Sequence, residues 1–341
     1  MHRTGPCPAR HGGGGVQDRD RDVLGQALPF VPPRFRTALV RCAVAAPATT
    51  WLEIRFGIGM PLRVVAAAGD LWVGEAGPVA TPAQALVADG QDVDQALQLV
   101  TRGSVYAWES ELANGFCTLP GGHRVGLAGR ARTDGDRVIG QTAFGAINLR
   151  LARAVPGAAD AVLAGLGRAW RGALIFGPPG SGKTTLLRDL CRQLSYGRPD
   201  LGLAPRRVVV VDERGEIAAC VDGRPQFDLG PRTEVLDAWP KASGILAAIR
   251  ALGPEVVACD ELGGAGEAMA VAEAGRCGVG VLATAHAGTL DDLLCRPQLA
   301  GLVASGAFQK AVRLAPDRSL GDIAPMATGV RVVGRPSCPA P

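Results

Sequence analysis

The chain has 341 residues, of which 47% are hydrophobic and 20% charged, with a formal net charge of 36 − 32 = +4. This length suits two domains that each bury a core, and this composition is that of globular rather than disordered proteins. Because the charge is mild and only 4% of the residues are aromatic, a groove for nucleic acid has little to be built from. We therefore expect no direct nucleic-acid partner.

The cysteines and the apolar runs indicate the cellular compartment of the protein. Nine cysteines are scattered without a C-x-x-C pair, which argues against a zinc site and a disulfide framework and is typical of a reduced cytosol. No uninterrupted apolar stretch approaches the roughly 18–20 residues of a membrane-spanning helix. The sequence predicts a cytoplasmic protein that reaches a membrane only peripherally, through a partner.

Residues 1–22 are rich in glycine and charge, and we expect them to form a disordered leader. A first, smaller α+β domain is predicted over 23–152. Its expected elements are strands at 52–56, 62–66 and 123–128 and a helix at 93–100. The Val155-Pro-Gly string predicts a linker over 153–168.

From residue 169 the pattern becomes a regular alternation of strands and helices. Runs that are apolar on both faces are typical of parallel strands covered by helices on both sides. These runs lie at 173–176, 208–211, 256–259 and 279–283, and helices are expected from 183 and over 242–252. The fold class is therefore α/β, with a P-loop NTPase domain of the RecA or AAA kind over 169–315 and a poorly packed tail over 316–341.

Residues 177–184 match the P-loop (Walker A) pattern G-x-x-x-x-G-K-[ST], between a predicted strand and a predicted helix. The glycines let backbone N–H groups approach phosphate oxygens, and the helix N-terminus adds unsatisfied donors. We expect Lys183 to reach the β- and γ-phosphates of ATP and Thr184 to bind Mg²⁺. The predicted nucleotide-binding residues are Gly177, Pro178, Pro179, Gly180, Ser181, Gly182, Lys183, Thr184 and Thr185.

Lysine is rare in this chain. The 36 basic residues comprise 33 arginines and three lysines, namely Lys183, Lys241 and Lys310. A retained lysine indicates a place where arginine does not serve, and the P-loop, which needs a compact point charge, is one such place.

Hydrolysis needs an acid at the end of a neighbouring strand, and two acidic pairs end apolar runs: Asp212-Glu213 and Asp260-Glu261. We assign Asp260 to the Mg²⁺ shell and Glu261 to polarising the attacking water, with Glu213 as a second candidate for water or metal contacts. His286 ends another apolar run, where it would sense the γ-phosphate. The alternatives are that an acidic strand end is a solvated terminus and that a lone histidine is a structural residue.

From about residue 23 to 314 the chain resembles the stage III sporulation protein AA family, which is related to the type II and type IV secretion and pilus ATPases. The resemblance rests on long strings of matching residues in both predicted domains. Among them are Leu52-Glu-Ile-Arg, Gly121-Gly-His-Arg-Val-Gly-Leu-Ala-Gly129, Gly182-Lys-Thr-Thr-Leu-Leu-Arg-Asp-Leu190, Val211-Asp-Glu-Arg214, Glu216-Ile-Ala218, Pro240-Lys-Ala242 and Asp260-Glu261.

The resemblance implies an acidic box at 211–214 and a histidine box at 284–286. It also implies that arginines of the first domain reach the nucleotide while the subunits form a hexameric ring, and here Arg150 matches, with Arg130 as a further candidate. Arg250, in the second domain before the Gly253-Pro254 turn, also matches a recurrent arginine of the family. This chain departs from the family after Gly263, where Gly264-Ala-Gly266 replaces an arginine and acidic residues, so the loop loses charge.

The implied function is that of a Mg-dependent ATPase, a motor that energises a membrane-spanning channel complex during endospore formation, with integral membrane proteins of that complex as partners. The alternative is a nucleotide-gated structural subunit with negligible turnover, which would have no need of Glu261. A nucleic-acid motor of the same P-loop group is disfavoured by the weak charge and the few aromatic residues.

Overall fold

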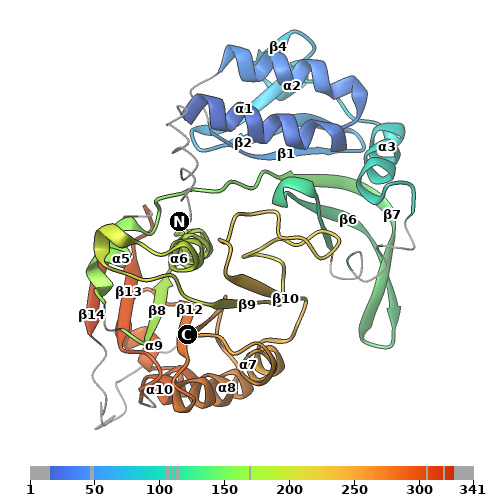
Figure 1. Ribbon diagram of the computed structural model, residues 1–341. Coiled ribbons are helices and arrows are strands. Elements are labelled where there is room, and N and C mark those ends of the chain that lie inside the picture. The colour runs from blue at the N-terminus through green and yellow to red at the C-terminus, as the bar shows by residue number, and fades with distance from the viewer. Residues whose placement is uncertain are drawn as a thin grey trace, which may run out of the picture. The chain divides into compact units, whose positions relative to one another are not determined.

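The computed structural model describes residues 16–46, 50–104, 108, 111, 115–168, 170–304, 306–317 and 319–325. The chain divides into two compact units, Met1–Arg153 and Ala154–Pro341 (Figure 1). Within the described residues no helix is long and apolar enough to cross a membrane.

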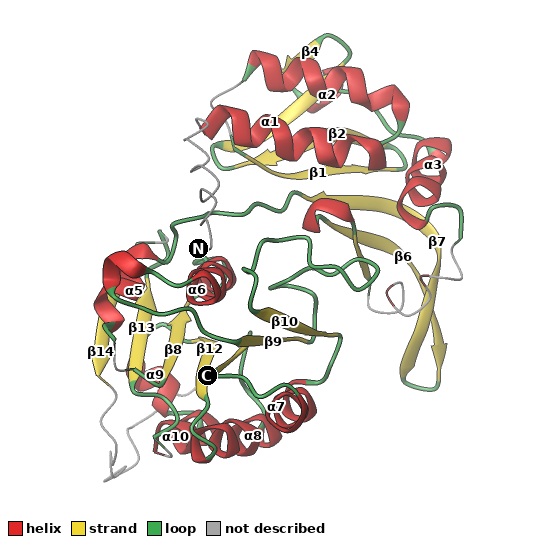
Figure 2. Ribbon diagram, in the orientation of Figure 1, coloured by secondary structure: helices red, strands yellow, loops and turns green. Residues whose placement is uncertain are grey.

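The first unit is a seven-stranded antiparallel sheet in the order β4-β3-β2-β1-β7-β6-β5, with the helices α1 and α2 on one face (Figure 2). Its strands are β1 (Trp51–Gly57), β2 (Met60–Ala66), β3 (Gly69–Gly74), β4 (Gly77–Val79), β5 (Phe116–Thr118), β6 (Arg124–Asp134) and β7 (Arg137–Arg150). Its helices are α1 (Val16–Ala27), α2 (Pro33–Ala45) and α3 (Gly90–Thr101), with short 3₁₀ turns at Leu28–Phe30, Pro82–Gln84 and Pro120–Gly122.

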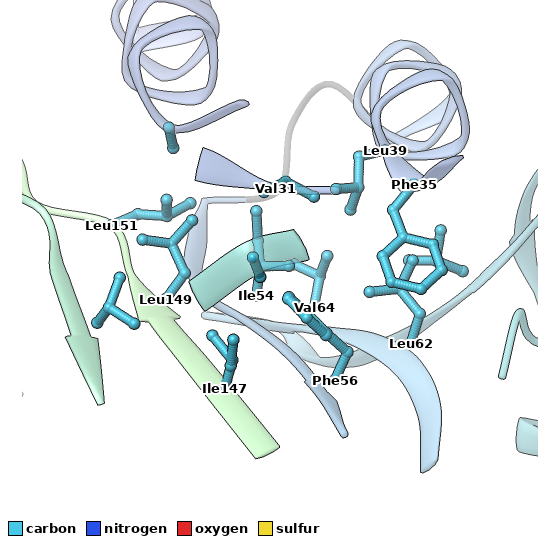
Figure 3. Close-up of a cluster of buried hydrophobic side chains, with 14 of the residues drawn as sticks. Val31, Phe35, Leu39, Ile54, Phe56, Leu62, Val64, Ile147, Leu149 and Leu151 are labelled. Atoms are coloured by element: carbon cyan, nitrogen blue, oxygen red, sulfur yellow. The ribbon is translucent and has the colours of Figure 1, made fainter. Parts of the chain in front are cut away.

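Strand alternation builds the core of this unit. Along β1, Ile54 and Phe56 are buried in a core that also contains residues of α2, while the arginine between them is only half-buried. Phe35 of α2 packs edge-on against Phe56 with ring centroids 5.5 Å apart, and neighbouring aliphatic residues fill the space around the pair (Figure 3).

The second unit is a seven-stranded sheet in the order β10-β9-β11-β12-β8-β13-β14, parallel except for the final β13–β14 pair. Its strands are β8 (Gly172–Gly177), β9 (Val208–Asp212), β10 (Thr233–Asp237), β11 (Val256–Cys259), β12 (Gly280–His286), β13 (Lys310–Leu314) and β14 (Leu320–Pro325). Its helices are α5 (Asp160–Leu166), α6 (Lys183–Tyr196), α7 (Lys241–Ala251), α8 (Ala265–Arg276), α9 (Leu290–Leu294) and α10 (Pro297–Ala304), with a 3₁₀ turn at Pro199–Leu201.

Helices cover both faces of this sheet. One core contains α5 and α6, the other contains α7, α8 and α10, and β8, β9 and β11 are buried along their whole length between them (Figure 2). The α/β fold class predicted from strands that are apolar on both faces is confirmed.

Three predicted boundaries differ from the structure. The expected leader 1–22 overlaps α1, which begins at Val16, and the rest of it lies outside the described residues. The expected linker 153–168 contains α5, because its apolar residues follow a helical spacing and are buried, which outweighs the Pro-Gly signal before them. The expected tail 316–341 contains β14, which pairs with β13, and residues 326–341 lie outside the described part of the chain.

Candidate functional site

The predicted P-loop connects β8 to α6. Gly180 and Gly182 have φ of 74° and 90°, in the left-handed region that favours glycine. A Cβ on Gly177 would lie 2.6 Å from the Leu314 carbonyl oxygen and 2.7 Å from the Ser181 hydroxyl, so no other residue fits there without a shift. α6 begins at Lys183, so its unbonded N–H groups open towards the loop.

A cavity of about 780 Å³ lies against this loop. Residues of the P-loop and of the start of α6, from Pro179 to Leu186, form one part of its wall, and Glu216, Glu261 and His286 add ionisable groups. The rest of the wall is apolar and comes from segments at both ends of the unit: Val155, Ala158, Ala161, Val162, Leu314 and Leu320.

Lys183 is buried at the base of the cavity. Its Nζ donates to the carbonyl oxygens of Gly177 at 3.0 Å and Pro178 at 2.8 Å, and lies 3.1 Å from His286 Nδ1. Burial lowers the pKa of this lysine, while the charges of Asp260 and Glu261 act to raise it.

His286 links the P-loop lysine to the predicted catalytic acid. Because an ammonium has no acceptor, His286 Nδ1 must accept from Lys183, which leaves Nε2 to donate to Glu261 Oε1 at 2.7 Å. The geometry therefore selects the Nε2-protonated tautomer and connects three predicted site residues into one chain.

The two predicted magnesium residues are in direct contact. The hydroxyl of Thr184 donates to Asp260 Oδ2 at 2.5 Å, and that of Thr284 donates to the other carboxylate oxygen. Burial raises the pKa of Asp260, and the two hydroxyl hydrogen bonds act to lower it. Asp260 directly follows β11, as expected for a residue at the carboxyl end of a parallel strand.

Glu261 follows with a left-handed backbone, φ 52°, although it has a side chain. Its carboxylate bonds His286 through Oε1 and accepts from Arg214 Nη1 through Oε2 at 3.0 Å. Partial burial acts to raise its pKa, but the hydrogen bond from His286, with the charges of Arg214 and Lys241, outweighs that effect and lowers the pKa overall.

The acids at the end of β9 have other partners. The buried Asp212 carboxylate accepts from the backbone N–H groups of residues 216–218 and so fixes that turn. Glu213 lies 3.4 Å from Lys241 Nζ and is not part of the cavity wall, whereas Glu216 is. Both acids also line a small cavity together with Asp260 and Glu261, so the structure adds Glu216 to the predicted Glu213 as an acid beside the site. Glu216 was not among the predicted site residues, and the signal that could have identified it is the family string Glu216-Ile-Ala218.

The three candidate arginines are all exposed. Arg150 ends β7 of the first unit, with its side chain 61% exposed and its Nε 3.3 Å from Glu53 Oε1. Arg130 is exposed on β6, and Arg250 is exposed in the last turn of α7. Within the second unit, no described arginine contributes to the wall of the P-loop cavity.

The family model of "Sporulation stage III, protein AA" matches residues 31–329. The Stage III sporulation protein AA of Bacillus subtilis is 38% identical over 304 residues, which cover 88% of this chain and 94% of that protein. The protein SEEDLING PLASTID DEVELOPMENT 1 of Arabidopsis thaliana is 32% identical over 159 residues, 46% of this chain and 22% of that one.

Two solved structures share the fold. The ATPase DotB of Legionella pneumophila has a TM-score of 0.53 at 17% identity, over 83% of this chain and 77% of its own. The pilus retraction motor PilT, solved with bound ADP, has a TM-score of 0.53 at 16% identity, over 81% of this chain and 77% of its own. With a family match over most of its length and the P-loop architecture of these proteins, the chain belongs to the sporulation stage III protein AA family.

Proposed function

We propose that the chain is a Mg-dependent ATPase that energises a membrane-spanning channel or transport complex during endospore formation. The observation that carries the proposal is the meeting of five predicted residues at one place: Lys183, His286 and Glu261 form one hydrogen-bonded chain, beside the bonded pair of Thr184 and Asp260.

The cavity suits a nucleoside triphosphate. Its P-loop wall offers the backbone donors and the helix N-terminus that bind phosphates, and its apolar wall offers a surface for an adenine ring. Among proteins with this fold, DotB is named an ATPase and PilT was solved with ADP, which supports the same ligand class here.

The residues also fit the Mg²⁺ that accompanies ATP as part of the substrate. Mg²⁺ keeps several waters and takes one or two protein oxygens together with phosphate oxygens. A hydroxyl and a carboxylate, from Thr184 and Asp260, supply that donor set. Within the described residues no cluster of three or more histidine, cysteine or acidic residues could hold a metal on its own, in line with a metal that arrives with the nucleotide.

For hydrolysis, Glu261 is the proposed group that orients the attacking water, because its carboxylate lines the cavity and its lowered pKa keeps it ionised. Lys183 must leave the Gly177 and Pro178 carbonyls to reach phosphate, and this also releases His286 Nδ1. In this proposal His286 reports the presence of phosphate to Glu261.

The proposal extends to a homo-oligomeric ring, by family resemblance a hexamer, held at the cytoplasmic face of a membrane by integral membrane proteins. The test is ATP turnover by the purified protein and by Glu261→Gln, with light scattering for mass on the same samples. Turnover that depends on Glu261 and rises with oligomer formation supports a ring motor. Bound nucleotide without turnover, in a monomer, supports instead a nucleotide-gated structural subunit.

A further inference from the structure

The geometry points to Lys241 as a positioning residue for hydrolysis, which holds the backbone of Glu261 in the conformation that aims its carboxylate at the cavity. This inference rests on the proposed ATPase function. Lys241 is the first residue of α7 and does not line the P-loop cavity, so it acts on the reaction only through the groups it binds.

Lys241 occupies a buried junction of three segments. Its side chain is 8% exposed, and its Nζ donates to the carbonyl oxygen of Glu261 at 2.7 Å. The same ammonium lies 3.4 Å from Glu213 Oε2, after β9, and 3.3 Å from Glu267 Oε1, on α8. One charge therefore ties α7 to the ends of β9 and β11 and to the start of α8.

The backbone held by this ammonium is strained. A glutamate at φ 52° is in a region that non-glycine residues adopt at a cost, and such residues persist only where the surroundings determine them. Here the Glu261 N–H donates to Thr284 Oγ1 at 2.8 Å while its carbonyl accepts from Lys241. Both polar groups of the residue are thus fixed, and with them the direction of its side chain.

Glu267 holds the same loop from its other side, and the contacts of Lys241 and Glu267 with residues 261–264 together form a clamp. Its Oε2 accepts from the N–H groups of Gly263 at 2.8 Å and Gly264 at 3.0 Å, while its Oε1 faces Lys241. Lys241 and Glu267 thus anchor the loop Glu261–Gly264 from outside it.

The chemistry of the junction explains a lysine in an arginine-rich chain. The three acceptors converge on one nitrogen from three segments, which suits the compact, rotatable ammonium and not a planar guanidinium fork. Two of the chain's three lysines, Lys183 and Lys241, thus lie at or directly behind the candidate site.

Hydrogen exchange tests the clamp without relying on turnover. The amides of residues 261–264 all donate hydrogen bonds, so they exchange slowly while the loop is held. In Lys241→Met we expect their exchange to rise at least about tenfold, with no change in the matched control Lys310→Met. Unchanged exchange at 261–264 in Lys241→Met would overturn the inference.

Turnover then tests the consequence. Lys241→Met should lower kcat by about 10²-fold, the loss that a displacement of roughly 1 Å can cause, with ATP affinity changed by less than about threefold. If the wild type and Lys310→Met fail to hydrolyse ATP, the proposed function fails while the exchange result still decides the clamp. If both hydrolyse and Lys241→Met matches them, the inference alone fails.

A triple variant separates positioning from stability. Removing Lys241 alone leaves Glu213 and Glu267 without their buried partner, which can unfold the domain. Lys241→Met with Glu213→Gln and Glu267→Gln removes all three charges, so the thermal midpoint should recover. We expect kcat to stay low, because the bond to the Glu261 carbonyl is still missing; recovery of kcat together with the midpoint would show that Lys241 is only structural.

Discussion

Thr184 and Asp260, 76 residues apart in the chain, are joined by a hydrogen bond of 2.5 Å. Thr184 lies in the first turn of α6 after β8, and Asp260 follows β11, which is separated from β8 in the sheet only by β12. Parallel strands bring their carboxyl ends to one edge of the sheet, so motif residues distant in sequence meet there.

Lys183→Ala should weaken nucleotide binding strongly. The lysine is the only charged side chain in the loop 177–184, and a hydrogen bond to a charged group contributes up to about 3 kcal/mol, or roughly 10² in Kd. Calorimetry with ATP measures the change, and Lys310→Ala serves as the control for loss of a lysine. An affinity equal to that of the wild type would refute the assignment of the site.

Glu261→Gln should retain ATP binding and lose turnover by about 10²–10⁴-fold, the usual contribution of a positioned acid or base. The amide keeps the shape of the side chain but cannot take a proton from water. Steady-state turnover alongside calorimetry gives both quantities. Near-normal turnover would transfer the role to another acid of the site.

Glu216→Gln should reduce turnover more than Glu213→Gln. Glu216 lines the P-loop cavity, whereas Glu213 lies against Lys241 and outside that wall. Parallel kinetics of the two variants compare them directly. A larger loss in Glu213→Gln would restore the expectation drawn from the acidic box and contradict the placement of Glu216.

The sequence predicted the parts of the site that lie in local motifs. The strand–loop–helix context placed Lys183 and Thr184, and the ends of apolar strands placed Asp260, Glu261 and His286, because strand direction alone determines where these residues go. The apolar runs likewise predicted the buried strands β8, β9 and β11 and the layers around them.

Other features depend on tertiary contacts that no local pattern contains. Asp212 and Asp260 both end apolar runs in the sequence, but the Asp212 carboxylate binds the backbone amides of the turn that follows it. After this turn Glu216, and not Glu213, lines the P-loop cavity. The role of Lys241 depends on three segments meeting at one nitrogen. The short helix α5 was missed because a Pro-Gly signal precedes it, although its apolar face is buried.

Acidification should destabilise the first unit through His123. Burial, with a smaller contribution from the charge of Arg153, lowers the pKa of this histidine from 6.5 to about 4, and its Nδ1 accepts from the Ala152 N–H at 3.1 Å. Between these pH values the unfolded chain is protonated and the folded chain is not. Stability is therefore complete above pH 6.5 and falls as the pH drops to about 4, by a total on the order of 3 kcal/mol.

Scanning calorimetry of the full chain from pH 7 to pH 4, on the wild type and on His123→Asn, measures this effect. Asparagine has an acceptor for the Ala152 N–H but does not titrate, so the variant should lose less stability on acidification than the wild type. Because carboxylates titrate in both proteins, only the difference between the two curves is informative, and parallel curves would show that His123 does not titrate as expected.

Arg150→Ala should lower turnover with little loss of stability. Its side chain is 61% exposed, and its partner Glu53 keeps a second ion pair, with Arg55 at 2.6 Å, when Arg150 is removed. We therefore expect a loss of no more than about 1 kcal/mol. The family resemblance implies that this arginine reaches a nucleotide across a subunit interface, where such a group would contribute about 10³–10⁵ in rate. Mixing Arg150→Ala with Lys183→Ala subunits tests whether the arginine acts on the nucleotide of a neighbouring subunit. Each variant alone is inactive, but in a mixed ring an intact P-loop can adjoin an intact Arg150, so activity should reappear on mixing. A neutral Arg150→Ala would make the arginine a surface residue, and an inactive mixture would place its action within one subunit.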